Sequence, residues 1–164
     1  METYTVSFFG HRELSDSFSI EARLQTIIRD LVLNKEYIEF LVGREGEFDQ
    51  IVASTIRYTK EHYGSENSAL VLVLPYMKAE YRDNMDSFLN YYDEVEICDE
   101  SADTYFKAAI QIRNRCMVDR SDLIVFCVER KHGGAYMTMK YALSNKEKII
   151  NLCSDRFSSN TELK

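Results

Sequence analysis

The stretch of sequence that decides the fold is residues 121–143, which read SDLIVFCVERKHGGAYMTMKYAL. Its six consecutive apolar residues, Leu123 to Val128, predict a strand that is buried on both faces, as in the middle of a parallel sheet. A charged loop follows at 129–132, and Gly133 and Gly134 come where a helix is expected to begin. Glycines at this point leave bare backbone N–H groups at a helix N-terminus, which predicts an anion-binding site.

The alternative for these two glycines is a flexible turn, and the neighbouring cations favour the anion site. The helix before the strand carries Arg113-Asn114-Arg115, and the loop adds Arg130, Lys131 and His132. Cations and open N–H groups at the carboxyl end of a strand suit a phosphate-bearing ligand. Neither a Walker-type loop nor a Gly-x-Gly-x-x-Gly motif accompanies them, so the pattern names no particular nucleotide.

Strands and helices alternate along the rest of the chain. This alternation predicts an α/β, doubly wound and mainly parallel sheet of about six strands with helices on both faces. Residues 1–153 are expected to form one domain, followed by a polar tail at 154–164. Strands are predicted at 4–9, 37–42, 69–74, 94–97, 123–128 and 148–152, and helices at about 17–33, 48–63, 103–118 and 136–143, with a loop or short helix at 78–86.

Composition and charge argue against several classes of function. The net charge of −7 argues against a surface that coats nucleic acid, so no nucleic acid partner is expected. No apolar run approaches the roughly 20 residues of a membrane helix, and the acidic start does not resemble a signal peptide. The cysteines form no Cys-x-x-Cys and share no ligand spacing with the histidines, so reduced thiols, a cytoplasmic location, no metal and no cofactor are expected. The cysteines are Cys98, Cys116, Cys127 and Cys153, and the histidines are His11, His62 and His132.

Arg113 stands out because helical spacing places it inside an apolar arc, whereas Arg115 shares the polar side with Asp119. A buried guanidinium needs a partner or a ligand, because leaving it unpaired is costly. The sequence leaves both options open, with Asp122 as the expected internal partner. Arg115 is expected to be a solvated charge that can pair with Asp119.

On its motifs the chain resembles the SLOG superfamily, which is named after the DNA-processing proteins and the LOG phosphoribohydrolases. The resemblance is greatest to small stand-alone bacterial and phage members with a Gly-His-Arg start. It implies a Rossmann-like fold and a site for nucleotides or nucleotide-derived ligands, including ADP-ribose-type molecules, and it makes a homodimer possible. The shared motifs are Phe8-Phe9-Gly10-His11-Arg12, Val42-Gly43, Gly46-Glu47-Phe48-Asp49, Arg113-Asn114-Arg115 with Met117, Ser121-Asp122, Gly133-Gly134-Ala135 and Lys148-Ile149-Ile150-Asn151-Leu152.

The resemblance breaks down at the catalytic motif of the LOG enzymes, Gly-Gly-x-Gly-Thr-x-x-Glu. Laid on Gly133-Gly134, its Glu position holds Lys140, so the carboxylate that would support N-glycosidic cleavage is absent there. Glu47 or Asp49 could supply a displaced acid; the alternative for both is capping of the helix N-terminus. No catalytic residue is therefore assigned from the sequence.

Three functions remain as hypotheses. The first is a protein that senses or sequesters a nucleotide-derived small molecule at the carboxyl ends of the strands. The second is a nucleoside 5′-monophosphate phosphoribohydrolase-like enzyme with a displaced acid, and the third is a partner-docking module. The expected ligand-binding residues are Gly10, His11, Arg12, Gly43, Arg44, Phe48, Asp49, Arg113, Asn114, Gly133, Gly134 and Ala135.

Overall fold

A computed structural model of the chain describes residues 2–64, 66–145 and 147–153. The predicted tail at 154–164 lies outside the described residues. The strands are β1 (Thr3–Gly10), β2 (Tyr37–Val42), β3 (Ser68–Leu74), β4 (Glu94–Ile97), β5 (Leu123–Cys127) and β6 (Ile149–Asn151). The helices are α1 (Ser17–Asn34), α2 (Glu47–Tyr63), α3 (Ala79–Arg82), α4 (Met85–Tyr91), α5 (Asp99–Ala102), α6 (Phe106–Asp119) and α7 (Gly134–Ser144).

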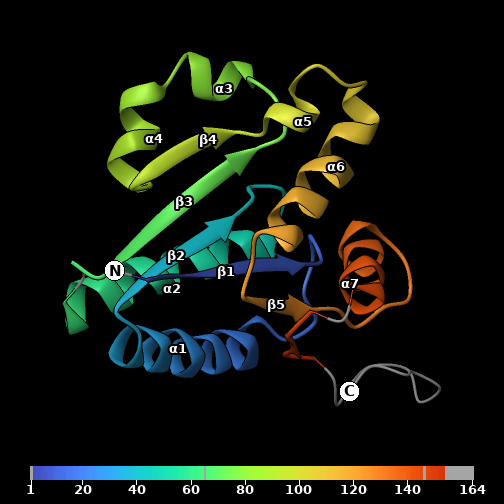
Figure 1. Ribbon diagram of the computed structural model, residues 1–164. Coiled ribbons are helices and arrows are strands. Elements are labelled where there is room, and N and C mark those ends of the chain that lie inside the picture. Colours follow the sequence, from blue (N-terminus) through green and yellow to red (C-terminus); the bar gives the residue numbers. More distant parts are fainter. Residues whose placement is uncertain (1, 65, 146, 154–164) are drawn as a thin grey trace.

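The six strands form one sheet in the order β4-β3-β2-β1-β5-β6, and every pair of neighbours is parallel (Figure 1). This Rossmann-like α/β sheet confirms the predicted fold class. The chain moves outward from β1 in one direction through β2, β3 and β4, and then returns to the other side of β1 with β5. The topological switch point lies between β1 and β5, where Gly10 is in register with Cys127. Ligands of such sheets bind outside the carboxyl ends of the strands at this point.

Two apolar layers cover the sheet, one on each face. Alternate residues of β1 point to opposite faces, so Phe8 belongs to the apolar layer that includes residues of α1, α2 and α4, while Phe9 belongs to the layer that includes residues of α6 and α7. Figure 1 shows α1 and α2 on one side of the sheet and α6 and α7 on the other. Helices on both faces explain why β3 and β5 are buried at every residue.

The structure corrects the sequence-based boundaries between β4 and β5. The helix expected to begin at about residue 103 begins at Phe106, and a separate short helix, α5, precedes it. The hydroxyl of Thr104 donates a hydrogen bond to the carbonyl of Ser101 at 2.8 Å and so closes α5. Segment 78–86, expected as a loop or a short helix, contains α3 and the first two residues of α4.

No helix within the described residues combines the length and the apolar character that a membrane span requires.

Candidate functional site

A cavity of about 270 Å³ lies at the switch point, between the carboxyl ends of β1, β2 and β5 and the helices α6 and α7. The structure thus brings together residues that are more than a hundred positions apart in the sequence. Ten of the twelve residues predicted to bind ligand line this cavity: Gly10, His11, Arg12, Gly43, Asp49, Arg113, Asn114, Gly133, Gly134 and Ala135.

Arg113 lies in the wall of the cavity and is paired internally. Its side chain is only 2% exposed, and its Nη2 donates a hydrogen bond to Glu45 Oε1 at 2.7 Å. Its Nη1 donates to the carbonyl of Val73 at 2.8 Å, and its Nε to Asn114 Oδ1 at 3.0 Å. The partner is therefore Glu45 and not the predicted Asp122, whose carboxylate accepts from the N–H of Thr5 at 2.8 Å. Since all three nitrogens already donate, the guanidinium holds β2, β3 and α6 together.

Gly43 makes room for this cluster. A Cβ at Gly43 would lie 2.5 Å from Glu45 Oε1 and 3.3 Å from both Arg113 Nη1 and Asp49 Oδ2. Real Cβ atoms essentially never approach another atom as closely as 2.5 Å. Glycine at the end of β2 is thus required so that two carboxylates and a guanidinium can meet.

The two carboxylates of the cluster have opposite pKa shifts. Burial raises the pKa of Glu45, but the charge of Arg113 and its hydrogen bond outweigh burial, and the pKa lies below its ordinary value. Burial and then the negative charge of Glu45 raise the pKa of Asp49 to about 7. Asp49 Oδ2 accepts a hydrogen bond from the N–H of Glu45 at 2.9 Å, which opposes this rise. One carboxyl group is therefore firmly ionised, and its neighbour exchanges a proton near neutral pH.

His11 forms part of the cavity wall as a neutral group. Its Nε2 accepts hydrogen bonds from the N–H groups of Glu129 at 2.9 Å and Arg130 at 3.2 Å. Burial and then the charge of Arg130 lower its pKa to about 4, so at neutral pH the proton is on Nδ1. The imidazole fixes the loop that leads from β5 to α7, and it does not add a positive charge to the cavity.

The N-terminus of α7 opens into the cavity. Gly133 is its N-cap residue, with φ +93° and ψ 174°, a conformation that is almost restricted to glycine. No side chain among the described residues caps this helix, so the first N–H groups, those of Gly134 and Ala135, have no helical partner. Thr138 and Asn114 connect the first turn of α7 to α6. The Thr138 hydroxyl donates a hydrogen bond to the carbonyl of Gly134, and Asn114 Nδ2 donates a hydrogen bond to that hydroxyl, both at 3.0 Å.

Two predicted residues lie outside the cavity wall. Arg44 points away from it, pairs with Glu80 at 2.7 Å and stacks on the ring of Phe88. Phe48 is fully buried under the end of β1, where a Cβ on Gly10 would lie 2.3 Å from its ring. Arg130 and His132, the loop cations expected near the phosphate, also line the cavity. Four further lining residues were not among the expected ligand-binding residues, because only the fold brings them to the cavity; these are Phe8, Phe9, Glu45 and Ile110.

The carboxylates considered as displaced acids differ in their surroundings. Glu47 accepts hydrogen bonds from the N–H of Leu14 at 2.8 Å and the hydroxyl of Ser17 at 2.9 Å, so it anchors the loop before α1. Asp49 lines the cavity. Lys140 is exposed on α7, with its ammonium near the ring of Tyr136.

Comparison with known proteins identifies the fold. No family model and no curated protein matches the chain. The X-ray structure of DNA processing protein A from Streptococcus pneumoniae aligns with 89% of the chain at a TM-score of 0.61 and 10% identity. DNA processing protein A from Helicobacter pylori, described for its single-stranded DNA binding mode, aligns with 89% at a TM-score of 0.60 and 14% identity. The chain covers 49% and 63% of these two proteins, so it corresponds to a part of each.

These similarities establish a shared Rossmann-like fold with the DNA processing proteins and contradict one expectation. The net charge of −7 predicts that no nucleic acid partner binds. That exclusion is wrong, because the H. pylori protein, which has the same fold, binds single-stranded DNA. In general, the binding of a nucleic acid depends on the cations and aromatic rings at the binding site, and the net charge of the whole protein does not decide it.

Proposed function

We propose that the chain binds a nucleotide or nucleotide-derived ligand in the cavity between β1, β2, β5, α6 and α7, to sense or to sequester it. One observation carries the proposal: the uncapped N-terminus of α7 and the arginines Arg12 and Arg130 border the same cavity. Arg12 is exposed and forms neither a hydrogen bond nor an ion pair through its side chain with any described residue. Open N–H groups and a free guanidinium suit a phosphate group.

The size of the cavity limits what it can enclose. Ligand pockets usually measure about 300–1,000 Å³, and the volume here is about 270 Å³. We expect it to enclose one nucleoside phosphate. A larger ligand, such as an ADP-ribose-type molecule or a single strand of nucleic acid, would extend past the rim.

An exposed aromatic ring lies one helical turn from the cavity wall. Ile110 lines the wall, and Phe106 lies four residues earlier on the same face of α6, with 58% of its side chain exposed. Stacking of a base on an aromatic side chain is worth about 1–3 kcal/mol. An exposed ring one helical turn from the wall supports a ligand that carries a nucleobase.

Titration calorimetry against AMP, NAD, ADP-ribose and a single-stranded oligonucleotide tests the proposal. Arg12→Ala is expected to weaken the bound member of this panel about ten- to a hundredfold, because a charge-assisted contact contributes roughly 1.5–3 kcal/mol. The matched control is Arg29→Ala, which removes a partly exposed arginine charge toward the C-terminal end of α1 and should leave affinity unchanged. Heat from no member of the panel would overturn the proposal.

Asp49 supports a second candidate, hydrolysis of the N-glycosidic bond of a nucleoside 5′-monophosphate. A carboxyl group that keeps its proton near pH 7 can donate it to a leaving base, while water attacks the sugar carbon. Release of free base from AMP, abolished in a folded Asp49→Asn variant, would support this reaction. Binding of AMP without any release of base would exclude it and leave the binding role intact.

A further inference from the structure

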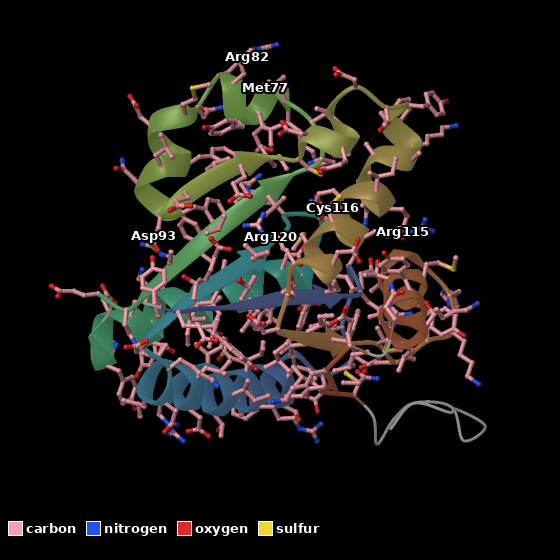
Figure 2. All side chains as sticks on the ribbon, viewed as in Figure 1. Met77, Arg82, Asp93, Arg115, Cys116 and Arg120 are labelled. Atoms are coloured by element: carbon pink, nitrogen blue, oxygen red, sulfur yellow. The ribbon has the colours of Figure 1, made fainter. Side chains whose placement is uncertain are left out.

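A second cluster of reactive side chains lies away from the cavity, where α5 and α6 pack together beside the end of β4. It consists of Cys98, Glu100 and Cys116, and one potential ligand atom from each lies within 4.8 Å of the other two. Figure 2 labels Cys116 on α6, close to the ends of β3 and β4. The cysteines are 18 positions apart in the sequence and fit no metal-binding spacing, so only the fold reveals their proximity.

The elements that carry the two thiols are firmly placed. The N–H of Cys98 donates to the carbonyl of Leu74 at 2.9 Å, which continues the pairing of β4 with β3. The hydroxyl of the fully buried Ser101 donates to the carbonyl of Pro75 at 2.6 Å and pins α5 against the loop after β3. The Cys98 thiol lies 3.4 Å from Glu100 Oε2. The three ligand atoms therefore do not depend on a mobile loop for their separation.

The surroundings of the cluster favour a cation. It opens into a groove of about 400 Å³ whose lining also includes Glu96, Asp99 and Asp119. The one cation in that lining, Arg120, is already paired with Glu96 at 2.7 Å and with Glu39 at 2.9 Å. Two sulfur atoms and a carboxylate thus meet in acidic surroundings.

We propose that Cys98, Glu100 and Cys116 bind a divalent transition metal ion of the zinc class. Thiolate and carboxylate ligands are typical of Zn²⁺, and ligand atoms about 2.0–2.3 Å from a tetrahedral ion are about 3.3–3.8 Å apart. Cys98 Sγ and Glu100 Oε2 are already 3.4 Å apart. All three ligand atoms lie within 4.8 Å of one another, so binding requires the other two separations to shorten by at most roughly 1 Å. On binding, each thiol releases its proton to solvent and the sulfur donates a lone pair to the ion, with no change of oxidation state. Water from the adjoining groove would supply the fourth ligand.

Titration of the reduced protein with Co²⁺ tests the site, because thiolate bonds to this ion produce near-ultraviolet charge-transfer absorption. One equivalent of Co²⁺ is expected to produce the full absorption band, and added Zn²⁺ is expected to displace the Co²⁺ and abolish the band. Cys98→Ser and Cys116→Ser should each weaken Co²⁺ binding at least about 100-fold, since even outer-sphere changes cost 10–100-fold. Glu100→Gln, at an exposed position, should weaken binding without affecting the fold.

The control is the other close pair of thiols, Cys127 and Cys153, whose sulfur atoms lie 2.7 Å apart. Cys153→Ser should leave the cobalt band unchanged. The proposal fails if the wild-type protein shows no thiolate band, if the band survives in both Cys98→Ser and Cys116→Ser, or if only Cys153→Ser removes it. Circular dichroism of each variant separates loss of the site from loss of the fold.

Discussion

Arg113→Ala is expected to lower the free energy of unfolding by about 3–5 kcal/mol, the usual cost of removing one partner of a buried ion pair. The substitution leaves Glu45, whose side chain is 14% exposed, without its main counter-ion, and it leaves the carbonyl of Val73 without a donor. For a chain of this size the loss corresponds to a melting temperature that is lower by about 6–20 °C. Urea denaturation and thermal melting at neutral pH measure both quantities.

The pH dependence of this loss has a defined sign. The pKa of Glu45 in the folded protein is lowered by Arg113, so the pair stabilises the fold above the ordinary carboxyl pKa. The stabilisation disappears as the pH falls through the lowered pKa. The difference between wild type and Arg113→Ala should therefore be largest near pH 7 and should shrink in acid.

A double-mutant cycle separates the ion pair from simple packing. Glu45→Gln removes the uncompensated charge, so in the Arg113→Ala background it should cost much less than in the wild type, with a coupling above about 1 kcal/mol. The control is Arg29→Ala, which removes a partly exposed side chain of α1 and should change the free energy of unfolding by less than about 0.5 kcal/mol. A loss below about 1 kcal/mol in Arg113→Ala, the level of a surface pair, would refute the assigned role.

Three further perturbations follow from the geometry of the site. Gly133→Ala places a side chain at φ +93° and should lower the free energy of unfolding by about 1–3 kcal/mol in urea denaturation. Gly134→Ala should cost less, because the only atom near the added Cβ belongs to the side-chain amide of Gln111, which can move. Equal losses in the two variants would refute the backbone strain at Gly133. Gly10→Ala drives a Cβ into the ring of Phe48 and should cost about 1–3 kcal/mol, seen as a lower melting temperature. Asp49→Asn should raise stability relative to wild type at pH 8 and change it little at pH 4. Folding raises the pKa of Asp49 from 3.8 to about 7, so wild-type stability falls as the pH rises between these two values. Parallel pH profiles from urea denaturation would contradict this.

Local sequence determined most of the fold. Runs such as 69–74 and 123–128 are apolar throughout, and a strand buried on both faces needs no information from elsewhere in the chain. Alternation of these runs with amphipathic helices then predicts parallel strands and a site at their carboxyl ends. Ten of the twelve predicted site residues line the cavity for this reason: they lie at the carboxyl ends of β1 and β2, in the first turn of α2, at the start of α7, or on α6.

Only the tertiary structure decided which side chains meet. Asp122, nine positions from Arg113, bonds to the backbone of β1, while Glu45, 68 positions away, takes the guanidinium. The order of the strands decides which carboxylate pairs with Arg113, because the carboxyl ends of β2 and β3 lie beside the part of α6 that carries Arg113. The same applies to Cys98 and Cys116, which only the fold brings together. It also applies to His11, an expected ligand-binding residue whose Nε2 accepts hydrogen bonds from the loop after β5. Sequence spacing reports neighbours within one helix or strand, whereas contacts between elements depend on strand order and register, which the whole chain fixes together.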